Sequence, residues 1–388
     1  MTTYLALTPR DPLIARDGRP LGAGQGLRMK SLDWPYPSVL AGSLRSLLGK
    51  LKGGEFAEGT VKALQEIEVA GPLPLLGDQL YFPAPKDLVV FEDEAKNRKI
   101  IRLRPMELKD GAGCNLPSAQ LWPVAVSQDV KPAKTPAFWS SAQMTRWLLD
   151  QEVVPPERGE YGSGFLDAPA KDERMHVSID PDSYAAKKGL LFMTVGLDMN
   201  FQGRASPLSL AARIEANDQW RGMLRKLDAF HPLGGERRLA RWRAEASHTW
   251  DCAGELRTAF RKASHVRLIL ATPAIFNDGW KPAWLDKTAL EGGPPGTSVC
   301  LKLVGACVER WKPISGWSLV NRQVGPKQLR RLVPAGSVYF FEVIRGEALE
   351  LIDRLWLRSV ADDIQDRRDG FGLALWGIWN KDQGGVRR

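Results

Sequence analysis

Two short glycine–arginine motifs have the residue types and spacing that best suit binding of a phosphate group. Exposed backbone N–H groups and guanidinium groups both donate hydrogen bonds to phosphate oxygens. For each motif taken alone, a glycine-containing strand packed under a helix is an equally good interpretation. The candidate binding residues in the two motifs are Gly234, Gly235, Arg237, Arg238, Arg367, Arg368, Gly370 and Gly372.

The second motif is predicted to lie at the start of a strand over residues 367–379. Alternate side chains of a strand point to opposite faces, so Gly370 and Gly372 would share one face. Phe371 and Leu373 would then make the other face apolar. Because glycine weakens a strand interior, two glycines on one face indicate that another group approaches the backbone there.

A helix is predicted from Pro37 to Leu51, with Ser38 as its cap and leucines at the i, i+4, i+7 spacing of a buried face. The opposite face aligns Ser38, Gly42 and Arg45. Glycine inside a helix is less stable than alanine by about 1 kcal/mol. A helix face that only contacts water would more often carry another residue, so Gly42 indicates a function. We therefore expect this face to accept a phosphate backbone, anchored by Arg45.

Two further basic segments are candidates, with a solvated loop as the alternative for each. The first is the glycine-rich loop that follows an expected strand from Thr3 to Leu7, and the second spans residues 321–331. The candidate residues in these segments are Arg16, Arg19, Lys30, Arg322 and Lys327.

Length and composition set the limits for these motifs. The 388 residues favour two domains, and 54 Lys and Arg against 45 Asp and Glu give a net charge of +9, which favours an anionic partner. No apolar run approaches the roughly 20 residues of a membrane helix and no signal pattern opens the chain, so we expect a cytoplasmic protein. Four cysteines without CxxC spacing and four scattered histidines predict no zinc site, and no cofactor is expected.

The order of predicted elements indicates an α+β fold of two tandem ferredoxin-like domains, 1–250 and 251–388. In the first domain we expect strands at 174–180 and 190–198, a helix at 207–228 and a basic strand after the first glycine pair. The second half repeats the order: strands at 265–271, 298–308 and 337–345, helical stretches around 280–290 and over 347–358, and the final glycine strand.

Residues from about 52 to 172 are expected to form a large insertion in the first domain. They contain a predicted hairpin, with strands at 88–91 and 99–103, and a short helix from Ser140 to Gln151. We expect this insertion to contact a partner or RNA, although its tryptophans are better explained as core or interface residues than as base-stacking ones.

Several motifs in one order resemble the repeat-associated mysterious protein (RAMP) superfamily. More narrowly, they resemble the third-named subunit of type III-B (Cmr) CRISPR effector complexes. The resemblance covers nearly the whole chain outside residues 52–172. The motifs that carry it are 16–20 (RDGRP), 37–45 (PSVLAGSLR), 176–180 (HVSID), 233–238 (LGGERR), 272–276 (TPAIF) and 333–341 (VPAGSVYFF).

This resemblance implies tandem ferredoxin-like (RRM-like) domains with glycine-rich loops. It also implies a non-catalytic subunit of an antiviral ribonucleoprotein that binds the 5′ repeat-derived handle of CRISPR RNA (crRNA). Its neighbours would be the large polymerase-like Cmr subunit and the RAMP backbone subunits. The helix stripe at 38–45 and both glycine loops would then face the RNA.

Two other functions stay open from the residues alone. A metal-independent endoribonuclease of the same superfamily would use a histidine as acid or base, and His176 on a predicted strand is the best candidate. A lone strand histidine is more often a packed one. A scaffold that binds only protein would leave the glycine and arginine pairs unexplained.

Overall fold

The structure is a computed structural model that describes residues 2–16, 27–29, 31–108, 111–126, 128–156, 164–200, 207–245, 250–318 and 325–381. The chain forms two compact units. The first unit comprises residues 1–77, 168–246 and 313–331, and the second comprises 78–167, 247–312 and 332–388. Among the described residues, no helix is long and apolar enough to cross a membrane.

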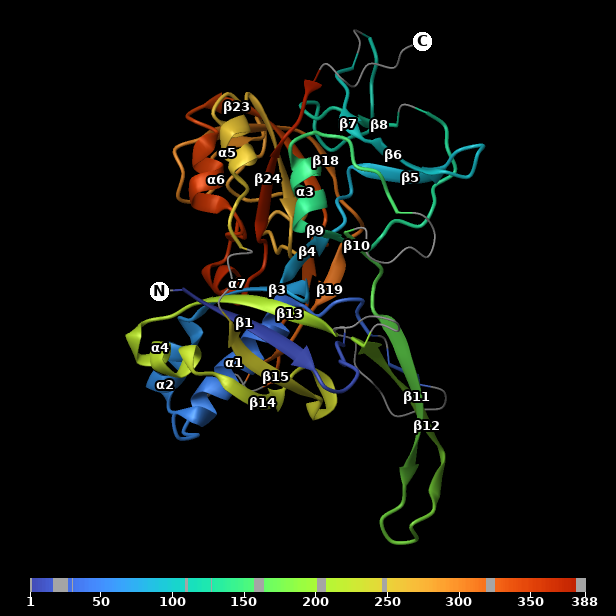
Figure 1. Cartoon of the computed structure of the whole chain (residues 1–388), viewed down its shortest axis with the longest axis vertical. Coiled ribbons are helices and arrows are strands. Elements are labelled where there is room, and N and C mark those ends of the chain that lie inside the picture. The colour runs from blue at the N-terminus through green and yellow to red at the C-terminus, as the bar shows by residue number, and fades with distance from the viewer. Residues whose placement is uncertain are drawn as a thin grey trace. The chain divides into compact units, whose positions relative to one another are not determined.

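An antiparallel sheet with helices on one side organises the first unit (Figure 1). Five of its strands pair in the order β3-β13-β1-β15-β14. Their bounds are β1 Thr2–Pro9, β3 Glu68–Leu76, β13 Leu208–Glu215, β14 Asp228–Pro232 and β15 Leu239–Glu245, and a short 3-10 helix, η1 Gly235–Arg237, lies between β14 and β15. The helices are α1 Pro37–Leu51, α2 Glu58–Gln65 and α4 Asp218–Arg225.

Helix α1 forms as its leucine spacing predicts. Leu40, Leu44, Leu47 and Leu48 are all buried, because this spacing places them on one helical face against the sheet. The expected Ser38 cap is wrong. Pro37 opens the helix, and the N-cap position is Tyr36, whose side chain makes no capping hydrogen bond.

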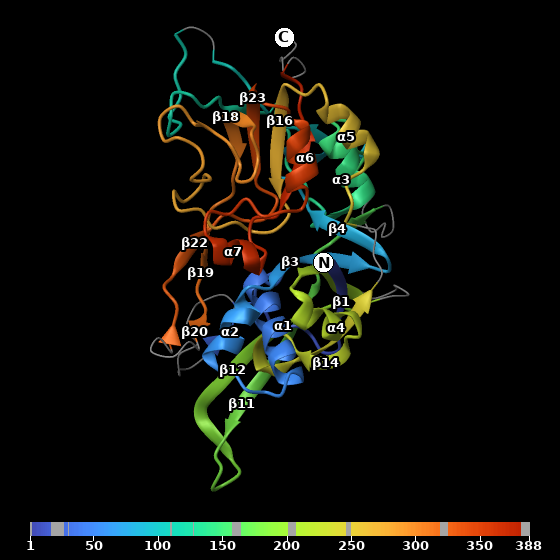
Figure 2. The same ribbon diagram turned by 90° about the vertical axis from the view of Figure 1, so that its left-hand side faces the viewer.

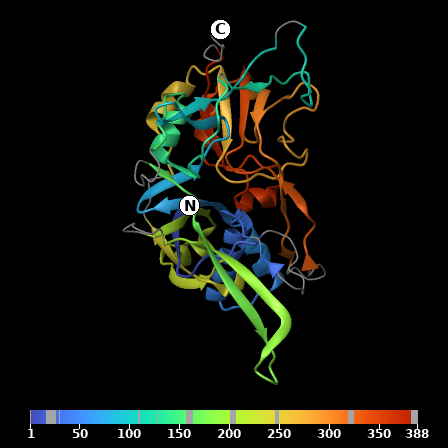
Figure 3. The same cartoon turned by 90° about the vertical axis from the view of Figure 1, so that its right-hand side faces the viewer.

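The predicted strands at 174–180 and 190–198 form, but they lie outside the five paired strands above. They are β11 Ala170–Ile179 and β12 Ala186–Asp198, a long two-stranded ribbon that projects from the first unit, with β2 Leu27–Arg28 parallel to β12 (Figures 1 and 3). The predicted single helix at 207–228 is also wrong, because its first part is strand β13. Seven of the eight β13 residues are buried, so both faces of this strand are covered. Its sequence therefore lacks the apolar–polar alternation that distinguishes a strand from a helix.

The second unit contains a sheet with the order β17-β18-β23-β16-β24. These strands are β16 His265–Leu270, β17 Glu291–Gly292, β18 Cys300–Cys307, β23 Val338–Arg345 and β24 Ala374–Ile378. Three more strands pair as β10-β9-β4, which are β4 Gln79–Pro83, β9 Phe138–Ser140 and β10 Phe165–Leu166. The helices are α3 Ser141–Leu148, α5 Gly254–Phe260, α6 Leu349–Leu355 and α7 Ile364–Asp369.

Small hairpins complete the architecture. The predicted hairpin in the insertion is confirmed as β5 Leu88–Glu92 with β6 Arg98–Arg102. The other pairs are β7 Arg104–Pro105 with β8 Val124–Ala125, β19 Lys312–Ile314 with β22 Arg330–Leu332, and β20 Trp317–Ser318 with β21 Gly325–Pro326. The helical stretch expected around 280–290 is a chain of turns instead.

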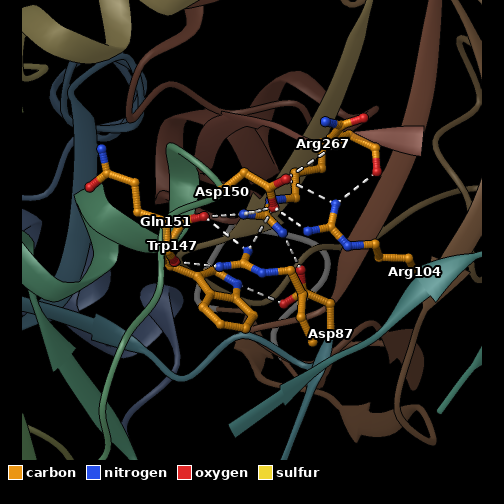
Figure 4. A network of polar contacts seen from close by, with 8 residues as sticks. Asp87, Arg104, Trp147, Asp150, Gln151 and Arg267 are labelled. Atoms are coloured by element: carbon orange, nitrogen blue, oxygen red, sulfur yellow. Dashed lines mark hydrogen bonds and ion pairs between the residues drawn. The ribbon is translucent and has the colours of Figure 1, made fainter. Parts of the chain in front are cut away.

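Residues 78–167 belong to the second unit rather than to an insertion in the first, so the compact units differ from the expected bounds 1–250, 251–388 and 52–172. A buried ion pair supplies the physical reason (Figure 4). Arg267 on β16 donates to Asp87 at 2.7 Å, and both side chains are fully buried. The indole of Trp147 on α3 also donates to Asp87, at 2.9 Å. A charge removed from water must be paired, so these contacts tie 78–167 to β16.

A second carboxylate extends this network. Asp150 accepts from Arg104 at 2.9 Å and lies 3.2 Å from Arg102. Arg102 also donates to the carbonyl of Gln151 at 2.7 Å, and Arg104 donates to that of Asn380 at 2.8 Å. Burial, with repulsion from nearby guanidinium groups, lowers the pKa of Arg102 to about 9.

Candidate RNA-binding surface

The first glycine motif forms an exposed turn between β14 and β15 that packs on the chain segment after β1. Gly234 has a φ of +77°, and a Cβ there would lie 2.4 Å from the carbonyl oxygen of Ile14. Gly235 donates its N–H to that same oxygen at 2.7 Å. Only glycine permits this backbone conformation and this close approach without strain.

This contact brings together basic residues from distant parts of the sequence. Arg16 follows Ile14 by two positions, and Arg10 donates its N–H to the carbonyl of Leu239 at 2.9 Å. Arg10, Arg16 and Arg237 are exposed. We call this region of the first unit the glycine-turn surface, and its members are Arg10, Arg16, Gly234, Gly235, Arg237 and Arg238.

One arginine of this surface, Arg237, keeps its side-chain donors available. Among the residues that the structure describes, Arg237 makes no hydrogen bond or ion pair, and its φ of +52° holds it in the left-handed region. Arg238 is half-buried, and its Nε is a buried atom without a hydrogen-bond partner in the described chain. Left-handed backbone at a non-glycine residue is uncommon and is often found where a side chain must point in a required direction.

The second glycine motif is closed, and the strand expected over 367–379 is wrong at its start. Residues 364–369 are helix α7, Gly370 is its left-handed C-cap, and β24 begins only at Ala374. Both glycines are buried. The carbonyl of Gly370 accepts from Thr272 at 2.7 Å, and the N–H of Gly372 donates to Pro273 at 2.8 Å.

The arginines of the second motif are also engaged in the fold. Arg367 donates from Nε to the carbonyl of Ala361 at 2.6 Å and from Nη2 to that of Asp362 at 2.9 Å. Arg368 is half-buried. In the second motif both glycines are therefore buried, and the Nε and Nη2 groups of Arg367 are bonded within the fold.

The stripe predicted on α1 is used mainly for packing. Arg45 donates from Nε to the carbonyl of Leu64 and from Nη2 to that of Ile67, both at 2.9 Å, and so holds the end of α2. Gly49 is buried, and a Cβ there would lie 2.4 Å from Phe56. Ser38 is half-buried, whereas Gly42 is exposed with open space around it.

Three other predicted residues, Arg19, Lys30 and Arg322, lie outside the described residues. Lys327 is exposed, and its N–H donates to the carbonyl of Gly316 at 2.7 Å. Of the predicted set, the structure therefore brings together Arg16 and the first glycine motif. Arg10 was missed, although its place three residues after the predicted strand Thr3 to Leu7, close to the basic loop, was a usable signal.

His176, the candidate acid or base of the nuclease alternative, lies on the projecting ribbon. Its Nε2 is 2.9 Å from the hydroxyl of Thr194, and its ring stacks on Phe192 at 5.2 Å. Within the described chain, no group of His, Cys, Asp and Glu residues is arranged to hold a metal ion.

The ribbon also presents an apolar face that the motif analysis missed. The strand register places Met175 opposite Met193 and Val177 opposite Leu191. Met175 is 56% exposed, and Val177 and Leu191 are also exposed. Apolar residues at every second position of β11 could have predicted this face, because they lie on one side of a strand. On a projecting ribbon these side chains are exposed to solvent instead of forming a core.

Comparison with solved structures finds similar chains at low identity. One, in the cryo-EM structure of the Type III-B Cmr-beta bound to cognate target RNA, is 16% identical over 87% of this chain and 86% of that chain, with a TM-score of 0.47. Another, in the crystal structure of the Csm3-Csm4 subcomplex in the type III-A CRISPR-Cas interference complex, is 10% identical over 97% of this chain and 99% of that chain, with a TM-score of 0.40.

No curated protein matches the chain. A family model does, over residues 5–379, and its description is CRISPR-associated protein (Cas_Cmr3). That match spans nearly the whole chain and confirms the resemblance read from the motifs, so the chain belongs to the Cas_Cmr3 family of CRISPR-associated proteins.

Proposed function

We propose that this chain is a non-catalytic RNA-binding subunit of a type III-B CRISPR ribonucleoprotein effector. It binds the 5′ handle of crRNA and docks the large polymerase-like subunit in antiviral defence, in the cytoplasm. The observation that carries the proposal is the glycine-turn surface, where arginines from distant segments surround an exposed turn.

The chemistry of this surface suits a phosphate backbone better than a neutral ligand. Guanidinium groups bind phosphate oxygens through charge-assisted hydrogen bonds, and Arg237 has its donors free within the described chain. Each phosphate that is neutralised releases counterions, so the affinity should fall steeply with salt. Bases splayed from a single strand would supply sequence selectivity.

We further propose that both units are ferredoxin-like. The strand order β3-β13-β1-β15 in the first unit and β18-β23-β16-β24 in the second both follow the pattern second-third-first-fourth along the chain. That pattern, with α1 and α4 as the crossover helices of the first unit, is what a βαββαβ unit requires. In the second unit, turns replace the first crossover helix within the described residues.

The non-catalytic assignment is supported by the surroundings of His176. The ring stacks on Phe192 and its Nε2 lies 2.9 Å from the hydroxyl of Thr194, which are the contacts of a packed strand histidine. The endoribonuclease alternative predicts that the RNA is cleaved and that cleavage depends on His176, and the same experiment tests this.

The test is binding and integrity, on one gel, of a labelled crRNA with its 5′ handle and of the same RNA with the handle scrambled. Metal is left out and salt is varied. We expect tighter binding of the intact handle, weaker binding at higher salt and no cleavage. Cleavage that disappears in His176→Ala would establish the nuclease instead. Equal affinity for both RNAs would contradict handle recognition by this chain.

A further inference from the structure

Two cavities in the second unit, of about 520 and 480 Å³, share Leu149 as a common wall residue. We call them together the α5 trench. One is lined by α3, by the residues that open α5 and by Trp356. The other is lined by the residues that end α5 and by the chain after β24. In the second unit, α3 and α5 lie close together (Figure 2).

One face of α5 lines both cavities. Glu255 belongs to the first cavity, and Ala259 and Lys262 belong to the second. Glu255 and Ala259 are four residues apart on α5, so they share one side of the helix. Lys262 lies two residues beyond Phe260, the last residue of α5. Half-buried Leu149 and Ala259 form the apolar middle of the trench.

The two ends of the trench carry opposite charge. At the start of α5, Asp251 and Glu255 are exposed, and neither has a hydrogen bond or ion pair through its carboxylate in the described part of the chain. Arg146 also lines this end, where its guanidinium donates twice to the carbonyl of Glu152. Two carboxylates against one guanidinium leave this end net negative.

Basic residues line the other end. Lys262 is exposed and makes no ion pair within the described residues. Lys381 pairs with Glu107 at 3.1 Å, and His265 lies 3.7 Å from Glu342. Asp150 also lines this cavity, but Arg102 and Arg104 already neutralise it. Among the described residues that line this end, Lys262 is thus the cation without an ion pair.

We propose that the α5 trench docks one segment of a neighbouring protein subunit, which carries a cation near Asp251 and Glu255, an apolar side chain over Leu149 and Ala259, and an anion near Lys262. The inference rests on the proposed function, because it assumes that the chain works inside a multi-subunit complex. A helix of the partner running antiparallel to α5, with opposite charges toward its two ends, has this polarity.

The opposite charges at the two ends of the trench make RNA a poor occupant. Its backbone is negative along its whole length, so the Asp251 and Glu255 end repels it. The glycine-turn surface has the opposite property, because its four arginines outnumber the one exposed carboxylate of the turn, that of Glu236. A charge-polarised trench instead selects both a partner and its orientation.

The trench has a rigid wall, which suits docking. The carbonyl of Trp147, at the end of α3, accepts from Arg102 at 3.1 Å and from the buried Arg267 (Figure 4). A preformed groove on a fixed helix loses little conformational freedom when a partner binds.

The structural alternative is that these charges only stabilise α5. Acidic residues near a helix start and basic residues near its end interact favourably with the helix dipole. Glu255 and Lys262 have such positions, whereas Asp251 precedes the Ala253 cap and lies outside the first turn. The alternative predicts lower stability for charge variants and no effect on assembly.

The first test places a photo-reactive amino acid at Ala142, an exposed residue of the trench wall, in the full chain assembled with its partner subunits and crRNA. We expect a cross-link to one protein segment with a Lys or Arg toward Asp251 and an Asp or Glu toward Lys262. A control probe at Lys287, whose side chain is 82% exposed outside the trench, should not reach this segment. A cross-link to RNA, or none to protein, would overturn the proposal.

The second test reverses charge at one end, with Asp251→Lys and Glu255→Lys combined. Binding of the separately purified partner subunits should weaken about tenfold, as expected for losing two rim ion pairs. Glu347→Lys, an exposed reversal outside the trench, is the matched control and should have no effect.

The same double variant separates the two proposals. Unchanged crRNA affinity and thermal stability together with weaker assembly support the trench. Normal assembly overturns the trench and leaves the RNA-binding proposal intact. Failure of the unaltered chain to bind either crRNA or partner subunits overturns the proposed function itself.

Discussion

The two glycine–arginine motifs look alike in sequence but have opposite roles in the fold. In the first unit, Gly234 and Gly235 pack on Ile14 and leave Arg237 exposed with its donors free among the described residues. In the second unit, Gly370 is buried and Arg367 donates twice to backbone carbonyls. Similar residue types thus build an open surface in one unit and a closed structural turn in the other.

The difference teaches that a donor-rich motif is a binding candidate only if the fold leaves its donors unused. The Nε–H and one Nη2–H of Arg367 hold two carbonyls, so turning the whole guanidinium toward a phosphate would leave both carbonyls unsatisfied, at about 1–3 kcal/mol each. Long-range contacts decide this, and the local sequence does not contain them.

The largest predicted effect removes the anchor of the closed motif. Arg267 lies on β16, and the residues just after that strand, Thr272 and Pro273, hold Gly370 and Gly372. Asp87→Ala removes the nearest counter-charge of the fully buried Arg267 and leaves only Asp150 at 3.9 Å among the described residues, so the second unit should lose about 3–5 kcal/mol of unfolding free energy. Denaturant unfolding measures this loss.

Glu347→Ala, at an exposed site of the second unit, is the control and should change stability by less than about 0.5 kcal/mol. A similarly small loss in Asp87→Ala would show that the buried network does not hold the unit together, and the closed motif would then need another explanation.

Arg367→Ala tests the closed motif directly. It removes the donors to Ala361 and Asp362, so the unfolding free energy should fall by about 1–3 kcal/mol. Affinity for handle-bearing RNA, measured where the variant is still folded, should not change. Loss of affinity with unchanged stability would place RNA on the second motif and erase the contrast between the units.

Arg45→Ala tests whether Arg45 on α1 stabilises the fold, as Arg367 does, or binds RNA, as proposed for Arg237. The carbonyls of Leu64 and Ile67 lose their donors, so thermal unfolding should report a loss of about 1–2 kcal/mol. Lys62→Ala on α2 loses only an exposed pair with Glu58 and should cost no more than about 0.5 kcal/mol. If Arg45→Ala instead lowers RNA affinity at constant stability, the helix stripe is part of the RNA surface.

The smallest expected effect is a gain. A Cβ at Gly42 would meet no atom within 4 Å, so Gly42→Ala should stabilise α1 by about 0.5–1 kcal/mol through its helix propensity. RNA affinity should stay the same if this face is only solvated. Weaker RNA binding would show that a backbone approaches α1 closely there.

Local sequence patterns predicted the elements whose signals are local. The leucines of α1 and the hairpin of β5 and β6 form as expected. Helix α7 was missed although its signals were present. Asp363 caps it by accepting from the N–H groups of Gln365 at 2.7 Å and Asp366 at 3.2 Å, and Gly370 ends it in the left-handed conformation.

The RNA-binding residues stay a prediction. Glycines beside arginines indicated close backbone approach, which the structure has at Gly234 and Gly372, although Gly372 lies in a turn where a strand was expected. The pairing of Arg367 with Ala361 and the contact between Gly235 and Ile14 both depend on tertiary packing. The same is true of the buried pair of Asp87 with Arg267, which assigns residues 78–167 to the second unit.

The most direct test of the account is a salt series of handle-RNA binding for the unaltered chain, Arg237→Ala and Arg367→Ala. The account predicts weaker binding and a salt slope smaller by about one for Arg237→Ala, with Arg367→Ala matching the unaltered chain. The reverse pattern, with Arg237→Ala silent and Arg367→Ala impaired, would contradict the assignment of RNA to the glycine-turn surface.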